Sequence, residues 1–328
     1  MTIVGKDSKT MDELLKDGEW NIYYVSSLYK FQHDRDALTT DATDLLAFLR
    51  RADASQDDLK PYQGVSVSVR SNDDMAIFSV QEQVAGTGGS SSGQFAGAFV
   101  YFTPREYQGN PSGNAPQLLL LRGNERLVTK VCEWVQHRYQ CIVALQSLRI
   151  RSVSMEQFAQ SLFLNIASQA DEGVAQRLTS VFYACMLHVD ETTAIHTPLK
   201  LTLRNEAEAK VVHSVTVSIP YLDIQAKYEL QSAETLWSNK VRAPALLQSL
   251  MPSVDRMIRS LVLPYCSQLS EDMGTYSLAA VSCDECELDS HGILRILRTD
   301  RLTEIFTDLL DIFTEQEVTI PETLETTL

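Results

Sequence analysis

An α+β fold with a curved, mostly antiparallel sheet flanked by helices is predicted for this chain of 328 residues. Segments that favour β-strands outnumber those that favour helices, and most of the strand segments alternate apolar and polar residues. This alternation is typical of antiparallel strands with one buried face, so we expect the helices to cover one face of the sheet. Similar strand and helix content before and after about residue 150 also allows two pseudo-equivalent halves.

The first half is predicted to contain a strand, a helix and then a run of strands with one further helix. Residues 20–31 are rich in aromatic and β-branched side chains, which favours a strand. Residues 40–51 place leucines and a phenylalanine on one helical face after threonine and aspartate caps. A second helix is predicted over residues 124–139. The other strands predicted here are residues 64–70, 74–84, 95–102, 117–121 and 140–150.

The second half is predicted to mix helices with alternating strands. One helix is expected to begin at Ser154, because Gln157 three residues later completes a capping-box pattern. Residues 171–188 fit a helix or a strand equally well. The remaining predicted helices are residues 253–263 and 302–313, and the predicted strands are residues 198–204, 215–219, 275–283 and 292–298.

The sequence is expected to divide into four regions. We expect a flexible N-terminus over residues 1–18 and an N-terminal α+β half over 19–150. A C-terminal α+β half with the partner-binding strands is expected over 151–314, and an acidic tail over 315–328.

The charge balance argues against a protein whose main role is to bind nucleic acid or an anionic membrane. Lysine and arginine total 28 against 43 aspartates and glutamates, a net charge of −15, whereas phosphate lattices favour basic surfaces. No run of about 18 apolar residues predicts a membrane span, and no secretory signal is expected. Six scattered cysteines are typical of an intracellular, reduced protein.

One serine-containing motif matches the nucleophile elbow of hydrolases. Residues 89–93 read Gly-Ser-Ser-Ser-Gly, but the elbow needs a strand before the serine and a helix after it. Here the serines lie in a glycine- and serine-rich run that leads into a predicted strand. We therefore interpret residues 84–93 as a flexible loop, with a serine hydrolase as the less favoured alternative.

The cysteines and histidines do not predict a metal site. Cys283 and Cys286 form a single CxxC pair, with Cys266 upstream and His291 downstream, whereas structural zinc usually takes two close pairs. We interpret Cys283 and Cys286 as flanking an acidic turn between strands. Since no carboxylates lie in a catalytic pattern either, we expect no catalytic residues, no cofactor, no metal and no enzyme activity.

A local basic segment interrupts the acidic composition between residues 122 and 151. Cations recur every four residues, with Trp134 in the same spacing, and would share one side of a helix that starts near Gly123. Such a surface can follow a phosphate backbone or meet an acidic partner, although an ordinary solvated helix face has the same pattern. The members of this predicted basic stripe are Arg122, Arg126, Lys130 and Arg138.

Four blocks of the sequence carry a pattern shared with one known family. The first is a tryptophan, an alternating strand and Leu-Tyr-Lys-Phe over residues 20–31, followed by Asp-Leu-Leu-Ala-Phe-Leu at 44–49. The second covers residues 117–145, with a leucine-rich strand, a Gly-Asn turn, Trp-Val-Gln, Tyr139 and Cys141. Residues 198–210 form the third block, and the closing strand and helix form the fourth. Read together, the four blocks resemble the centromere protein L family, although residues 221–263, the 84–93 segment and the acidic tail depart from it.

The resemblance implies a non-enzymatic scaffold of the inner kinetochore. Members of this family belong to the constitutive centromere-associated network, in the nucleus at the centromere, and act in chromosome segregation at mitosis. They form a heterodimer with centromere protein N, which reads the nucleosome carrying the centromeric histone variant. They also contact centromere protein C and the H, I, K and M subunits.

The resemblance also implies which residues bind the partner. In the family, C-terminal strands pair with the partner by adding to a sheet edge. That role would fall on residues 292–298 here, although core packing would select the same side chains. The assembled complex surrounds linker DNA, to which the basic stripe would contribute. The expected partner-binding residues are Ile293, Leu294, Ile296 and Leu297.

One other class of function is compatible with the same sequence. An unrelated intracellular α+β protein-interaction domain would show the same composition and the same elements. Deleting residues 84–93 would leave the partner binding of an adaptor intact and would abolish a hydrolase. An uncapped strand edge also allows the chain to pair with a second copy of itself.

Overall fold

The structure is a computed structural model that describes residues 10–16, 18–52, 65–84, 92–103, 117–144, 147–162, 198–205, 214–220, 223, 262 and 276–317. The chain divides into two compact units, one formed by residues 1–149 with 291–328 and the other by residues 150–290. The second unit begins at the expected boundary near residue 150. Residues 291–314, which the sequence assigned to the second half, group with the first unit.

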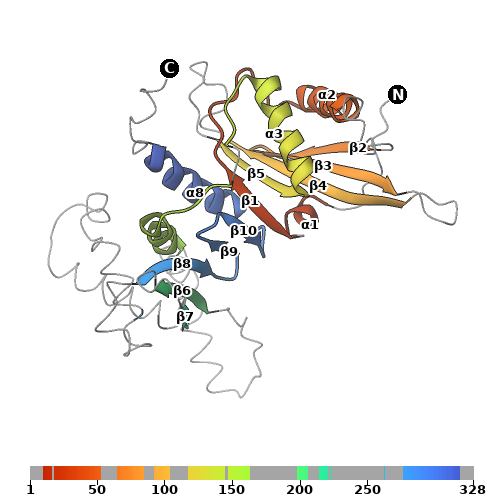
Figure 1. Cartoon of the computed structure of the whole chain (residues 1–328). Helices are drawn as coiled ribbons and strands as arrows, with labels where there is room; N and C mark the ends of the chain where they lie inside the picture. The colour runs from red at the N-terminus through yellow and green to blue at the C-terminus, as the bar shows by residue number, and fades with distance from the viewer. Residues whose placement is uncertain are drawn as a thin grey trace, which may run out of the picture. The chain divides into compact units, whose positions relative to one another are not determined.

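The first unit contains an antiparallel sheet of six described strands (Figure 1). Hydrogen-bonded neighbours follow the order β2-β3-β4-β5-β1-β10, so that the last described strand lies beside the first described strand. These antiparallel strands, together with the helices, confirm the predicted α+β class. The strands are β1 (Glu19–Tyr23), β2 (Ser66–Ser71), β3 (Met75–Val84), β4 (Ser92–Phe102), β5 (Leu118–Gly123) and β10 (Ile293–Ile296).

Helices α2 (Arg35–Ala52) and α3 (Glu125–Tyr139) pack over β2 to β5, as Figure 1 shows. Helix α3 begins where predicted, because the Asn124 side chain accepts a 2.7 Å hydrogen bond from the Leu127 amide. Trp134 of α3 packs on the stacked rings of Phe78 and Phe99, with ring centroids 6.3 and 6.0 Å away. This aromatic group forms the centre of the core on that side of the sheet.

The opposite face of the same sheet is also covered, so the expectation of helices on one face is wrong. Helix α8 (Leu302–Glu317) packs Phe306 against Phe102 of β4, with ring centroids 5.3 Å apart. Helix α1 (Met11–Lys16) receives a 2.8 Å hydrogen bond from the Trp20 indole at the Leu15 carbonyl oxygen. The physical reason is that every residue of β3 from 75 to 80 is buried, so the strand needs cover on both faces.

The N-terminal segment, expected to be flexible, contains helix α1. Thr10 and Glu13 form a capping box, in which the Thr10 hydroxyl accepts from the Glu13 amide and the Glu13 carboxylate accepts from the Thr10 amide. Leu14 and Leu15 are both buried. The pattern Thr-x-x-Glu before two leucines was therefore a readable signal for this helix.

Two predicted strands are shorter than expected or absent. Strand β1 ends at Tyr23, because residues 24–29 leave the sheet and run beside residues 139–144. The described part of residues 140–150 forms no strand and makes one isolated bridge, between Val25 and Val143. Irregular backbone hydrogen bonds between these two segments replace a regular ladder.

The second unit contains four described antiparallel strands, in the order β9-β8-β6-β7. Residues 152–162 are helical, so the helix begins two residues before the predicted Ser154, which is buried within it. Strand β9 follows the acidic turn and was not predicted. The bounds are β6 (Leu199–Asn205), β7 (Ser214–Ile219), β8 (Tyr276–Ser282) and β9 (Cys286–Asp289).

Some predictions lie outside the described residues. These are the ambiguous segment 171–188, the predicted helix 253–263 apart from Val262, and the tail beyond residue 317. Within the described part of the chain, no helix is long and apolar enough to cross a membrane.

Candidate functional site

The predicted partner-binding strand is mostly a core strand. Leu294 and Ile296 expose 0% and 1% of their surface, Ile293 is half-buried and Leu297 exposes 39%. Residues 293–295 pair with residues 19–21 of β1. The expectation that this strand presents an open edge is therefore wrong on the side that faces β1, because the backbone groups there are used within the chain.

The basic stripe is not a single surface. Arg122 is the penultimate residue of β5, is buried, and stacks its guanidinium over the Trp20 ring at 4.8 Å. The prediction that Arg122 shares the helix face is wrong, since α3 begins only at Glu125. Lys130 forms a 2.8 Å ion pair with Glu133, and Arg138 pairs with carboxylates of α2. Of the four predicted members, Arg126, Lys130 and Arg138 therefore lie along the helix, and Lys130 and Arg138 form ion pairs with nearby carboxylates.

The serine motif at residues 89–93 lies outside the described residues, apart from the backbone of Ser92 and Gly93 in β4. The hydrolase alternative gains no support from the described residues.

Cys283 and Cys286 flank an acidic turn, as predicted; the turn joins β8 to the unpredicted strand β9, of which Cys286 is the first residue. Cys283 and Cys286 are both buried, and the Cys283 amide donates a 2.9 Å hydrogen bond to the Cys286 carbonyl oxygen. The hydrogen bond with the Cys283 thiol, together with burial, raises the pKa of the Cys286 thiol well above its ordinary value. No group of three or more potential metal ligands occurs among the residues that the structure describes.

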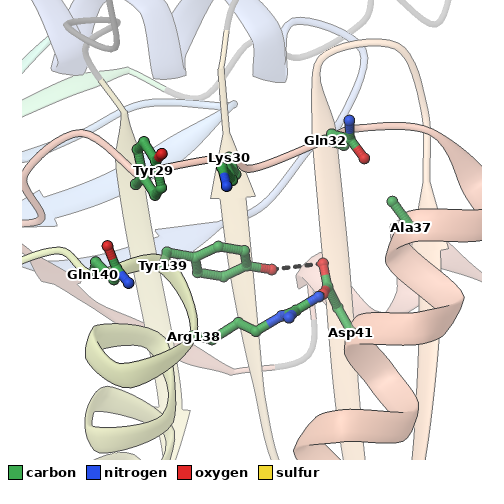
Figure 2. A pocket seen from close by; sticks show the side chains of 8 residues that line it. All are labelled: Tyr29, Lys30, Gln32, Ala37, Asp41, Arg138, Tyr139 and Gln140. Atoms are coloured by element: carbon green, nitrogen blue, oxygen red, sulfur yellow. Dashed lines mark hydrogen bonds and ion pairs between the residues drawn. The ribbon is translucent and has the colours of Figure 1, made fainter.

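A different set of residues comes together in a polar cavity of about 260 Å³ in the first unit. Its walls come from the segment after β1, from the first half of α2 and from the C-terminal end of α3 (Figure 2). We call it the α2–α3 cavity. It is lined by Tyr29, Lys30, Gln32, Ala37, Asp41, Arg138, Tyr139 and Gln140.

The end of α3 fixes one wall of the α2–α3 cavity. The helix stops at Gln140, which adopts a left-handed conformation with φ of 49°. The Tyr139 carbonyl oxygen then accepts a 2.9 Å hydrogen bond from the Tyr29 amide. This contact holds the segment after β1 against the helix end, so that Tyr29 and Lys30 lie beside Tyr139 (Figure 2).

Asp41 organises the floor of the cavity. Its side chain is 3% exposed, and Figure 2 shows Arg138 and Tyr139 both pointing at it. Arg138 donates to Oδ1 from Nε at 2.9 Å and from Nη2 at 2.7 Å. The Tyr139 hydroxyl donates to Oδ2 at 2.7 Å. Both carboxylate oxygens are thus occupied, as a buried charge requires.

The same contacts shift the titration of the two donors. Burial raises the pKa of the Tyr139 hydroxyl far above its ordinary value, and the hydrogen bond to Asp41 adds to that effect. The hydrogen bond to Asp41 also raises the pKa of the Arg138 guanidinium. Tyr139 therefore stays a hydrogen-bond donor and Arg138 stays a cation at any physiological pH. The α2–α3 cavity is a fixed set of donors rather than an acid–base device.

The rim of the cavity carries an aromatic ring and a cation. Tyr29 is 55% exposed, although it is a large hydrophobic side chain. The Lys30 ammonium lies 5.0 Å from the Tyr29 ring centroid, and it forms no ion pair or hydrogen bond with the described residues. The rim can therefore bind a group that is negatively charged and partly apolar.

Sequence reasoning named Arg138 but missed the cavity. The sequence did contain one indication of the cavity. Asp41 lies three residues after Leu38 and four before Leu45, so the helical period places this carboxylate on the buried face of α2. A carboxylate in such a position needs a buried partner. Which residue supplies that partner could not be read from the pattern.

No family model matches this chain, and no curated protein matches it.

Proposed function

We propose that the chain is a non-enzymatic inner-kinetochore scaffold of the centromere protein L type, which pairs with centromere protein N in the nucleus. Its partners in this proposal also include centromere protein C and the H, I, K and M subunits. Contact with the centromeric nucleosome and linker DNA belongs to the assembled complex.

One observation supports the proposal beyond the resemblance itself. Segments that carry the resemblance in separate parts of the sequence pack on one another in the first unit. Phe31, the end of Leu-Tyr-Lys-Phe, lies with its ring centroid 5.5 Å from that of Tyr139. The Trp134 indole donates a 3.1 Å hydrogen bond to Asp44, the first residue of the Asp-Leu-Leu-Ala-Phe-Leu block. Blocks that pack together are more easily explained by one shared fold than by chance likeness.

The burial of β10 changes which residues can serve as contacts. Leu294 and Ile296 support the core, so in this proposal they position the strand rather than contact the partner. Leu297, which directly follows β10, has a large exposed apolar surface, and Ile293 is half-buried. Leu297 is therefore the expected contact in this segment.

The test is coexpression with centromere protein N from the same organism, followed by size-exclusion chromatography with light scattering. The expected result is a one-to-one heterodimer that Leu297→Asp weakens. Val153→Asp is the matched control, because Val153 is an exposed aliphatic residue in the second unit. A folded chain that does not associate with centromere protein N would refute the proposal. Equal weakening by both variants would refute the role of Leu297.

A further inference from the structure

We propose that the α2–α3 cavity is a docking site for an acidic side chain, Asp or Glu, in a peptide segment of a protein partner. This inference goes beyond the proposed function and does not depend on the identity of the partner. It rests on four properties of the cavity: unused donors, an excess of positive charge, a constrained backbone at the rim and an exposed aromatic ring.

The first property is that the donors in the α2–α3 cavity outnumber its acceptors. A guanidinium has five N–H donors, and Arg138 directs only Nε and Nη2 at Asp41. The side chain of Arg138 is 39% exposed, whereas that of Asp41 is 3% exposed. The outer edge of the guanidinium therefore remains accessible, while the carboxylate beneath it has no oxygen left for a ligand.

The second property is the local charge. Lys30 and Arg138 supply two positive charges and Asp41 supplies one negative charge. The residues that line the cavity thus carry one net positive charge, on a chain whose net charge is −15. Asp44 lies outside the lining, 4.0 Å from the Arg138 guanidinium, and because its side chain is 52% exposed, solvent weakens its effect on this charge. A single carboxylate balances this excess, whereas a phosphate monoester carries about −1.5 to −2 at neutral pH and usually meets an arginine cluster. The charge therefore favours a carboxylate.

The third property is the backbone of Lys30, whose φ is 60°. A non-glycine residue in this left-handed region costs about 1–2 kcal/mol, and such conformations gather at ligand-binding sites. Lys30 and Gln140 are the two described residues other than glycine with positive φ, and both line this cavity. A glycine at position 30 would relieve the strain but would remove the ammonium group.

The fourth property is the exposed ring of Tyr29, which lies beside the ammonium of Lys30. Tyrosine and arginine, together with tryptophan, are enriched among the residues that contribute most to binding at protein interfaces. An apolar side chain next to the docked carboxylate would pack on this ring. The preferred ligand is therefore an acidic residue with an apolar neighbour.

The experiment is a titration of the full chain followed by ¹⁵N NMR. The probe is the capped tripeptide acetyl-Leu-Asp-Leu-amide, and its neutral match is acetyl-Leu-Asn-Leu-amide. We expect saturable shifts of the Lys30 and Gln140 amides with the aspartate peptide only, with a Kd of about 1–10 mM, as for one ion pair with a small apolar contact. Lys30→Gln should raise this Kd by about fivefold, the equivalent of ~1 kcal/mol.

Two further variants separate binding from folding. Lys30→Gly should keep the fold, because it relieves the left-handed strain, and should weaken peptide binding as Lys30→Gln does. Lys200→Gln is the matched control, since Lys200 is an exposed lysine on β6 in the second unit, and it should leave the Kd unchanged.

Three results would overturn the inference. Equal shifts with both tripeptides would show that the charge is not recognised. Equal Kd values for the parent chain and Lys30→Gln would show that the Lys30 ammonium does not contribute to binding. Tighter binding of inorganic phosphate than of the aspartate peptide would assign the cavity to a phosphorylated ligand instead. None of these measurements uses centromere protein N, so a failure here is distinct from a failure of the proposed function.

Discussion

Replacing Asp41 with asparagine should destabilise the first unit more than any other single charge removal on α2. The side chain is 3% exposed and accepts three hydrogen bonds, two from Arg138 and one from Tyr139. Asparagine keeps the size and one acceptor oxygen, but it loses the charge and points a donor at existing donors.

The magnitude follows from the environment of each partner. Removing one member of a buried ion pair costs about 3–5 kcal/mol, but Arg138 is 39% exposed and regains water when its partner is lost. The Tyr139 hydroxyl is buried and cannot bind water instead, and an unpaired buried polar group costs about 1–3 kcal/mol. We expect a loss of about 2–3 kcal/mol in the free energy of unfolding, or about 4–12 °C in Tm.

The assay is urea unfolding followed by tryptophan fluorescence, since Trp134 packs beside this network. Asp44→Asn is the matched control. Asp44 is 52% exposed, lies 4.0 Å from the Arg138 guanidinium and accepts a hydrogen bond from the Trp134 indole. Asparagine keeps an oxygen that can accept this bond, so the substitution should lower the free energy of unfolding by less than about 1 kcal/mol. Equal costs for the two variants would refute the reasoning, because burial of the carboxylate would then not decide its contribution.

Three other predictions test the packing of the first unit. Burial raises the pKa of the Cys132 and Cys141 thiols from 9.0 to about 11. Between these pH values the unfolded chain loses the thiol protons while the folded chain keeps them, so the folded state is fully stable below pH 9 and becomes less stable as the pH rises toward 11. The free energy of unfolding should fall by about 1.4 kcal/mol per pH unit for each thiol over that range, and urea titrations of the double variant Cys132→Ala/Cys141→Ala should show a flatter dependence. Gly97→Ala should lower the free energy of unfolding by about 1–3 kcal/mol, because the new methyl group would lie 2.5 Å from the Arg122 carbonyl oxygen and 2.6 Å from the Leu127 side chain. An unchanged midpoint in urea unfolding would contradict this close approach. Trp20→Phe should lower the free energy of unfolding by about 1–3 kcal/mol, because it removes the buried hydrogen bond to the Leu15 carbonyl oxygen. Hydrogen exchange at the Leu14 and Leu15 amides should then accelerate. Unchanged exchange at these amides would show that other contacts hold α1.

Local patterns predicted the elements whose shape is set by near neighbours. Valines alternating with serines identified β2, and the apolar stripe with its asparagine cap identified α3 to within one residue at its start. The strand predicted over residues 140–150 was wrong for the described part of that segment, although most of its side chains are apolar. Its backbone bonds the segment 24–29 irregularly, and no local pattern encodes that partner.

The candidate site also depends on contacts that a local sequence pattern cannot predict. Arg138 was selected for its place in a row of cations, but its role comes from Asp41, which lies 97 residues away in the chain. The row itself was misleading at Arg122, because a spacing of four indicates a shared face only within one helix, and α3 begins after that residue.

The sequence by itself determined the α+β class, the positions of most strands and helices and the overall acidic charge, because hydrophobic period and composition are local properties. The tertiary structure alone decided that β10 lies against β1, with Trp20 opposite Leu294, and that helices cover both faces of the first sheet. It also decided that Lys30, Asp41 and Arg138 share one cavity. These are contacts between distant segments, and they depend on which apolar surfaces pack together rather than on any pattern within a single segment.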